Sequence, residues 1–163
     1  MILVAIGSNL NSESFGSPEQ NCKVAVDMLK EYFEVTKLSH FYKTEPIPKS
    51  EQPWFVNCIV NIKSEVSPSN LLDSLLHIES KFGRERGKKN EARVIDLDLI
   101  AYNRLIVNSL KLTLPHPRMH LRKFVIQPIC DINKNWIHPV LNKKASEILK
   151  ELANQKISNI NEN

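Results

Sequence analysis

The chain has 163 residues, of which 42% are hydrophobic and 25% are charged, and its formal net charge at pH 7 is +4. This composition is typical of one globular domain, and the length allows a hydrophobic core without disulfide or metal staples. The longest apolar run, residues 1–6, is far shorter than the roughly 20 residues of a membrane span, and no basic residue precedes it as in a signal peptide. We therefore expect a cytoplasmic protein with no membrane partner.

The three cysteines, Cys22, Cys58 and Cys130, are isolated and form no C-x-x-C pair. This usage is typical of reduced thiols rather than of a disulfide or zinc framework, and we expect all three to lie in the core. The small positive charge suits a single nucleotide as well as a nucleic acid. The position of the charges therefore matters more than their sum.

The first part of the sequence predicts a strand, a helix and two further strands. A buried strand is expected at residues 1–6. A helix is predicted over 17–33, because a serine cap and a proline at the first helical position precede an apolar stripe of three-to-four-residue spacing. Residues 35–42 and 54–63 are rich in strand-forming residues.

The predicted strand at 54–63 has two distinct faces. Alternation places Val56 and Cys58 on one face and Phe55 and Asn57 on the other. A flat ring beside a donor and acceptor amide would suit a planar heterocycle.

A second helix and two further strands follow. Ser67 and Pro68 repeat the cap-and-proline start of a helix that ends near Phe82, and strands are predicted at 94–102 and 105–107. The element order β-α-β-β-α-β is that of a ferredoxin-like α+β fold, with an antiparallel sheet and helices on one face.

The C-terminal third predicts less regular structure. The proline-rich stretch 114–128 allows one helical turn, and residues 143–153 predict a last helix. The residues after Lys156 are polar and are expected to fray. We predict one domain over residues 1–156, with a C-terminal extension to the ferredoxin-like core, and a polar tail at 157–163.

Two acidic residues lie inside the predicted strand at 94–102. Alternation puts Asp96 and Asp98 on one face, about 6–7 Å apart. Two carboxylates that close repel each other, and Asp is a poor strand former. A divalent cation shared with phosphate oxygens would relieve the repulsion. The alternative is a solvated strand face.

Basic residues crowd the segment just before this acidic pair: Lys81, Arg84, Arg86, Lys88, Lys89 and Arg93. Alone, such a run would indicate a solvated loop. Beside Asp96 and Asp98 it favours a phosphate site, in which the acids hold a metal and Arg forks hold oxygens. The four glycines form neither a P-loop nor a G-x-G-x-x-G motif. Side chains and metal must therefore hold the phosphates.

Two further positions are candidates for phosphate binding. Glu79 lies on the apolar stripe in the last turn of its helix, where the helix dipole disfavours an acid, although an ordinary boundary glutamate is the alternative. His116 lies between two prolines and starts a second cationic cluster with Arg118, His120, Arg122 and Lys123. This cluster favours phosphate contact or a surface loop, and zinc is not expected because no cysteine lies nearby.

Six short motifs, in order along the chain, resemble one known family. They are AIGSNL at 5–10, FYKTEPI at 41–47, QPWFVN at 52–57, IE at 78–79 with GRER at 83–86, RVIDLDL at 93–99, and LPH at 114–116. Over roughly residues 1–150 the chain is similar to the 6-hydroxymethyl-7,8-dihydropterin pyrophosphokinases of folate biosynthesis. The resemblance implies a ferredoxin-like monomer that transfers pyrophosphate from ATP to the pterin hydroxymethyl group and releases AMP.

The resemblance also implies the site residues and the cofactor. The catalytic residues would be Arg84, Arg93, Asp96 and Asp98, and Asp96 and Asp98 would hold two Mg²⁺ ions on the ATP. ATP contacts would come from Glu79, Arg86, Arg93, Leu99, Lys111, Thr113, His116 and Arg122. Pterin contacts would come from Thr44, Glu45, Ile47, Phe55, Asn57 and Phe124. To the opening turn Gly7, Ser8 and Asn9 we assign packing rather than chemistry.

Two other functions stay open at this point. Ferredoxin-like sheets also bind RNA, although the aromatic strand signature of that class is absent and acids on the sheet would repel phosphate. A Mg²⁺-dependent nucleotidyltransferase is the third possibility. The expected partners are ATP and the hydroxymethyldihydropterin, with no nucleic acid.

Overall fold

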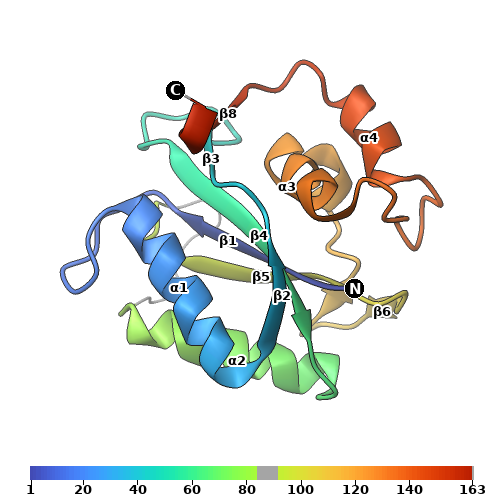
Figure 1. Ribbon diagram of the computed structural model, residues 1–163, viewed down its shortest axis with the longest axis horizontal. Helices are drawn as coiled ribbons and strands as arrows, with labels where there is room; N and C mark the ends of the chain where they lie inside the picture. Colours follow the sequence, from blue (N-terminus) through green and yellow to red (C-terminus); the bar gives the residue numbers. More distant parts are fainter. Residues whose placement is uncertain (84–91, 163) are drawn as a thin grey trace.

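An antiparallel sheet forms the centre of the computed structural model, which describes residues 1–83 and 92–162 (Figure 1). The strands along the sheet are, in order, β5 (Asp96–Tyr102), β1 (Ile2–Ser8), β4 (Phe55–Lys63), β3 (Tyr42–Thr44) and β8 (Ile157–Asn159). A further strand, β2 (Glu34–Leu38), also pairs with β4. Together with the helices, this sheet confirms the predicted α+β class.

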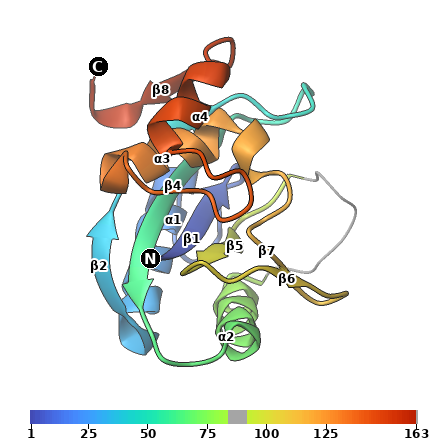
Figure 2. The same ribbon diagram turned by 90° about the vertical axis from the view of Figure 1, so that its right-hand side faces the viewer.

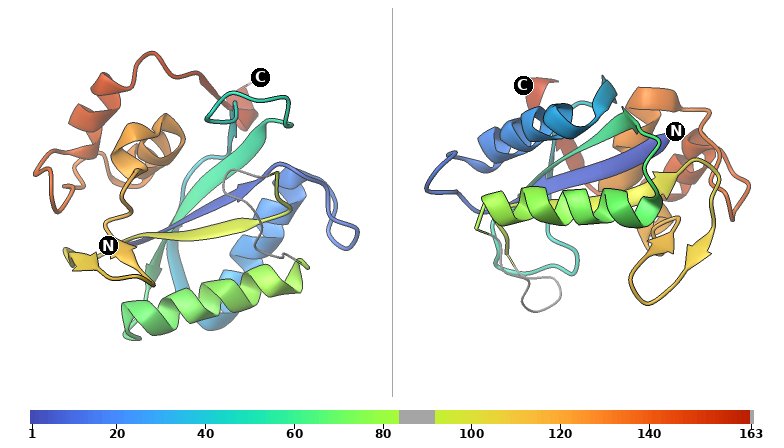
Figure 3. Two further views of the ribbon diagram at one scale, coloured as in Figure 1. Left: turned by 180° about the vertical axis from the view of Figure 1, so that it is seen from behind. Right: turned by 90° about the horizontal axis from the view of Figure 1, so that it is seen from below.

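Helices cover both faces of the sheet. Helices α1 (Pro18–Tyr32) and α2 (Pro68–Lys81) lie on one side, and α3 (Lys123–Asn133) and α4 (Ala145–Glu151) lie on the other (Figures 1 and 3). The element order predicts helices on one face only. The second layer arises because alternate residues of β1 and β4 are apolar on both faces, so both faces need cover.

The two helix starts form as the sequence predicts. Ser17 and Gln20 make a reciprocal capping box, in which the Gln20 N–H donates to Ser17 Oγ at 3.3 Å and the Ser17 N–H donates to Gln20 Oε1 at 2.8 Å. Ser67 Oγ likewise accepts from the Asn70 N–H at 3.2 Å. Each cap satisfies amides that the first helical turn leaves without a partner.

The predicted strand at 35–42 is divided into β2 and β3. Both segments pair with β4 in the same direction, and the ladder is interrupted between them at residues 39–41. There the Ser39 N–H donates to the Ile59 carbonyl at 2.9 Å, while the Ile59 N–H donates to Ser39 Oγ at 2.8 Å. The serine side chain thereby supplies an acceptor for an amide of β4 where the ladder is interrupted.

Helix α3 is longer than the single turn expected for the proline-rich stretch. Its buried residues follow helical spacing and pack under the sheet: Val125, Ile126, Ile129 and Ile132. Pro128 lies inside the helix, where the lost hydrogen bond and ring clash cost about 3 kcal/mol. Burial of the apolar stripe offsets this cost, which is the usual way tertiary packing outweighs local propensity. A 3-10 turn, Met119–Leu121, leads into the helix.

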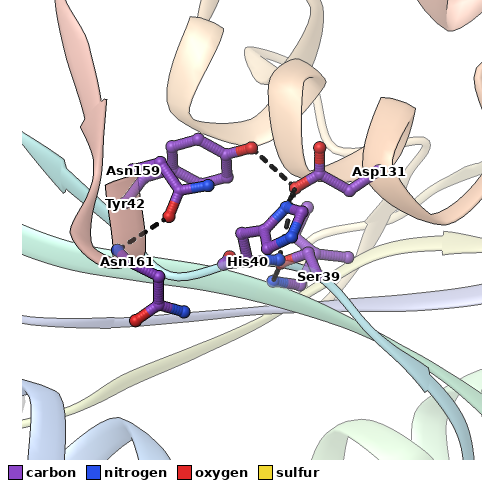
Figure 4. Close-up of polar contacts among 7 residues, drawn as sticks. Ser39, His40, Tyr42, Asp131, Asn159 and Asn161 are labelled. Carbon is purple, nitrogen blue, oxygen red and sulfur yellow. Dashed lines mark hydrogen bonds and ion pairs between the residues drawn. The ribbon is translucent and has the colours of Figure 1, made fainter. Parts of the chain in front are cut away.

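Asp131 ties α3 to the connection between β2 and β3 (Figure 4). Its Oδ2 accepts from Tyr42 Oη at 2.7 Å and from the His40 N–H at 3.2 Å. The Nδ1 atom of His40 lies 3.2 Å from the same oxygen. One carboxylate therefore joins the second helical layer to the sheet.

The C-terminal segment forms regular structure that its polarity does not predict. Residues after Lys156, for which polarity predicts fraying, form β8, because its ladder with β3 pairs backbone groups at an otherwise open sheet edge.

Cys130 is half-buried at the margin of the α3 layer rather than in the core, whereas Cys22 and Cys58 are buried as predicted. No helix among the described residues is long and apolar enough to cross a membrane.

A small hairpin lies beside the edge strand β5. Strands β6 (Val107–Asn108) and β7 (Thr113–Leu114) pair with each other, and the chain then passes along β5 toward α3 (Figure 2). The His116 N–H donates to the Ile100 carbonyl of β5 at 2.9 Å. This bond attaches the segment between β7 and α3 to the sheet.

Candidate active site

A pocket opens on the α3 side of the sheet, where β1, β4 and β5 meet. Three parts of the chain line it: the strands, the loop before β4, and the segment from His116 to α3. Predicted site residues among the lining are Thr44, Glu45, Ile47, Phe55, Asn57, Arg93, Asp96, Asp98, His116, Arg122 and Phe124. The fold thus brings residues of both predicted substrate sites together in one cavity.

The sheet register explains how the two sites become neighbours. Gly7 of β1 lies directly opposite Asn57 of β4 and directly opposite Asp96 of β5. Ala5 is likewise opposite Asp98. Opposed residues on neighbouring strands share a face. Asn57 and the two aspartates therefore point into the same pocket, separated only by small residues of β1.

The two aspartates have different surroundings. Asp96 Oδ2 accepts a hydrogen bond from Arg93 Nη1 at 2.8 Å, which forms an ion pair. Burial, together with the like charges of Asp96 and Glu79, raises the pKa of Asp98 to about 7 against the opposing effect of Arg93. A cation bound beside Asp98 would therefore stabilise the ionised form of this carboxyl group.

Glu79 lies at the outer edge of β5 and is only 3% exposed. Its Oε1 accepts a hydrogen bond from the Leu97 N–H at 2.8 Å. Because β5 is an edge strand, its outward amide groups have no neighbouring strand to accept their hydrogen bonds, and a buried amide needs another acceptor. This bond gives the glutamate a structural role that the helix pattern did not reveal, and an ATP contact through Glu79 stays a prediction.

His116 is held as a neutral hydrogen-bond donor. The Arg118 N–H donates to His116 Nδ1 at 3.2 Å, so the proton of the neutral ring is on Nε2. Burial, together with the positive charges of Arg122 and Arg118, lowers the pKa of His116 to about 4. Nearby, the Arg122 guanidinium lies 5.5 Å from the centre of the Phe124 ring. This wall of the pocket offers donors and positive charge.

The profile of the family described as 7,8-dihydro-6-hydroxymethylpterin-pyrophosphokinase (HPPK) matches residues 3–134. The chain belongs to this family.

Relatives support the assignment along the whole chain. A 2-amino-4-hydroxy-6-hydroxymethyldihydropteridine pyrophosphokinase of Haemophilus influenzae is 34% identical over 160 residues, which cover 97% of this chain and 96% of that protein. The Bacillus subtilis protein of the same name is 36% identical over 131 residues, covering 79% and 75%. A folic acid synthesis protein of Dictyostelium discoideum is 34% identical over 94% of this chain, which spans only 23% of that protein.

A solved structure shares the fold. A triple mutant of Plasmodium falciparum HPPK-DHPS superposes with a TM-score of 0.74 at 14% sequence identity. The match covers 92% of this chain and 44% of that longer chain. The HPPK fold described above therefore also occurs as part of a larger protein.

Some predicted HPPK site residues lie away from the pocket or cannot be placed. The side chain of Leu99 packs in the core beneath α1 and α2, on the opposite face of β5 from the aspartates. Lys111 is paired at 2.8 Å with Asp73 of α2, and Thr113 is in β7. Arg84 and Arg86 lie outside the described residues.

Asn9 joins two segments that flank the pocket, a role that the sequence did not reveal. Its Nδ2 donates to Gln52 Oε1 at 3.2 Å and to the Pro53 carbonyl at 3.0 Å, while its Oδ1 accepts from the Arg93 N–H at 2.7 Å. One buried amide thus joins the loop before β4 to Arg93, in the segment that leads into β5. The sequence predicts only packing for this turn. An Asn amide can both donate and accept, but this property alone does not indicate which distant groups Asn9 will bond.

The raised pKa of Asp98 predicts how stability changes with pH. The pKa of the folded carboxyl is near 7, whereas that of an ordinary aspartate is 3.8. The folded state therefore holds the extra proton between these pH values, and stability falls as the pH rises through them. Asp98→Asn should raise the free energy of unfolding of the metal-free protein at pH 8 by about 1–3 kcal/mol, with little change at pH 4. Urea denaturation at both pH values measures this.

Asp96→Asn is the matched control for this prediction. It removes the like charge beside Asp98 but also removes an ion-pair partner of Arg93, so at pH 8 it should stabilise the protein less than Asp98→Asn does. If Asp98→Asn lowers stability at pH 8, the charge repulsion assigned to Asp98 is refuted.

A second prediction concerns the ionisation of His116. Its imidazole should stay neutral from pH 8 down to 5, because its pKa is lowered to about 4, and its NMR signals should not titrate in that range. Arg122→Gln removes one adjacent positive charge and should move the midpoint upward. A midpoint above 6 in the parent protein would contradict the assignment of a neutral donor.

Proposed function

We propose that this HPPK-family pocket transfers pyrophosphate from ATP to the hydroxymethyl group of 6-hydroxymethyl-7,8-dihydropterin, releases AMP, and so acts in folate biosynthesis. The observation that carries the proposal is the row of residues across three strands. Asn57, Gly7 and Asp96 lie side by side on the pocket face. A heterocycle bound at Asn57 would therefore present its substituent toward the aspartates.

The pterin would bind in the part of the pocket between β4 and α3. Phe55 and Phe124 supply apolar rings for a flat heterocycle. Asn57 Nδ2 donates to Thr44 Oγ1 at 2.6 Å, which fixes the direction of the amide before substrate arrives. Glu45 and Ile47 line the same end of the pocket. A fixed amide loses little entropy when it binds the polar edge of the ligand.

The aspartate pair fits a magnesium site. Within residues 1–83 and 92–162, no group of three His, Cys, Asp or Glu side chains could hold a metal. Mg²⁺ bound with a nucleotide usually takes one or two carboxylates, and phosphates and water complete its shell. Asp96 and Asp98 would supply those carboxylates. A bound cation would favour the ionised form of Asp98, which burial and the neighbouring acids disfavour. When bound, Mg²⁺ would neutralise the phosphate oxygens. The count of two ions is part of the proposal.

The remaining polar residues would bind and orient the triphosphate. Arg93 reaches the same edge of the pocket as Asp96 and would stabilise charge on the transferring group. His116 would donate from Nε2 to a phosphate oxygen, and Arg122 would add positive charge. Arg84 and Arg86 are proposed, from the family resemblance alone, to act from the segment outside the described residues.

The reaction itself requires mainly positioning. The hydroxymethyl oxygen forms a bond to the β-phosphorus, the bond from that phosphorus to the oxygen of the α-phosphate breaks, and AMP leaves. The hydroxyl proton passes to solvent. Among the described lining residues, Asp98 and Asp96 are assigned to metal and His116 is already a neutral donor, so we assign no general base. Alignment of the two substrates then supplies most of the rate enhancement.

The RNA-binding and nucleotidyltransferase functions considered from the sequence are not favoured. The family match and the relatives named as pyrophosphokinases support pyrophosphate transfer instead. We propose further that the protein acts as a cytoplasmic monomer on these two small molecules.

A product assay tests the proposed function. The protein is incubated with ATP, Mg²⁺ and 6-hydroxymethyl-7,8-dihydropterin, and the nucleotide products are separated by chromatography. AMP should appear in equal amount with the pterin diphosphate, and Asp98→Asn should form neither. Formation of ADP, or of pyrophosphate with no modified pterin, would reject the proposal.

Arg93→Ala should lower kcat by about 10²-fold or more, because the guanidinium would act on charge that develops during transfer. The Kd for a non-hydrolysable ATP analogue should change far less. Steady-state kinetics and calorimetry measure the two effects, with Arg104→Ala as an exposed control after β5. A loss confined to ATP binding, with kcat unchanged, would show uniform binding instead.

A further inference from the structure

We propose that Gly7 is a positioning residue that keeps the Asn57 amide in its binding orientation, an inference that rests on the proposed pterin site. Gly7 occupies the middle of the row formed by Asn57, Gly7 and Asp96 and lines the pocket. The sequence assigned it packing only. Its environment indicates a more specific role.

The backbone at Gly7 does not itself require glycine. The residue lies in strand β1, and the glycines with positive φ among the described residues are Gly16 and Gly83. A glycine inside a strand lowers stability, because the unfolded chain gains freedom and no side chain packs. Glycine at position 7 therefore lowers stability and is not required by the backbone conformation. Its missing side chain is the feature that needs an explanation.

The space at Gly7 is limited by one neighbour. A Cβ atom built on Gly7 would lie 2.8 Å from Asn57 Oδ1, closer than carbon and oxygen approach without bonding. The next atoms, Asn57 Cγ and the Val56 carbonyl oxygen, would be 3.9 Å away, which is ordinary contact. The clash is therefore with the amide of Asn57 and not with Asp96 on the other side.

Asn57 cannot turn aside without loss. Its Nδ2 donates to Thr44 Oγ1 at 2.6 Å, and both residues are buried. Rotation of the amide away from residue 7 would break this bond and leave buried polar atoms without partners. Exchange of the amide oxygen and nitrogen would leave the nitrogen in the same close contact. A methyl group at position 7 must therefore shift the Asn57 amide out of the orientation in which it bonds Thr44 and faces the pterin site.

A double-mutant cycle tests this role, using Gly7→Ala, Asn57→Ala and the double variant. Gly7→Ala should raise the Kd for the pterin about tenfold or more, comparable with loss of a buried hydrogen bond. The Kd for the Mg²⁺ complex of a non-hydrolysable ATP analogue should change by less than about threefold. In the Asn57→Ala background, Gly7→Ala should have no further effect on pterin binding, because the clashing amide is gone.

A control separates this effect from general damage to the fold. Gly16→Ala places a side chain at a φ of 109°, outside the pocket. It should lower the melting temperature without a selective loss of pterin affinity. If Gly7→Ala does not fold, the double variant should fold, since Asn57→Ala removes the clash. Failure of that rescue would overturn the proposal.

The cycle also distinguishes the two proposals. If Asn57→Ala leaves pterin binding unchanged, the pterin site of the proposed function is wrong. If Asn57→Ala weakens pterin binding but Gly7→Ala does not, or if the two effects add, Gly7 has no positioning role and the pterin site stands. An equal loss of pterin and nucleotide affinity in Gly7→Ala would also overturn the proposal.

Discussion

The register of β1 between β4 and β5 is the constraint on which the site depends. β1 pairs with a neighbour along both edges, so Gly7 has Asn57 on one side and Asp96 on the other. A slip of one residue in either ladder would turn one partner to the opposite face, because side chains alternate along a strand. The apolar residues on both faces of β1 prevent such a slip, since each must stay in its own core.

The same register places the carboxyl groups of Asp96 and Asp98 on one face of β5, inside the pocket. Arg93 pairs with Asp96, while Asp98 keeps a raised pKa because of its burial and the nearby acids. A fold selected for stability alone would place apolar or neutral residues there. The unfavourable charge is consistent with a site that becomes most stable when a metal and nucleotide are bound.

The two layers of helices have different roles, one in the core and one in the site. Helices α1 and α2 close the larger core, whereas α3 and the segment before it cover the pocket face and supply His116, Arg122 and Phe124. Asp131 and the bond from His116 to Ile100 attach this second layer to the sheet. Packing of α3 therefore positions one wall of the site. A substitution that disturbs this packing would also weaken substrate binding.

By itself the sequence determined the features that depend on short segments. The capped helices α1 and α2 and the shared face of Asp96 and Asp98 follow from side-chain periodicity and local hydrogen bonds. The family followed from motifs in order. Only the tertiary structure decided the full length of α3, the pairing of β8, the bond from Glu79 to Leu97 and the bonds of Asn9. These depend on partners distant along the chain, and no local pattern specifies which buried polar groups will meet when apolar surfaces pack.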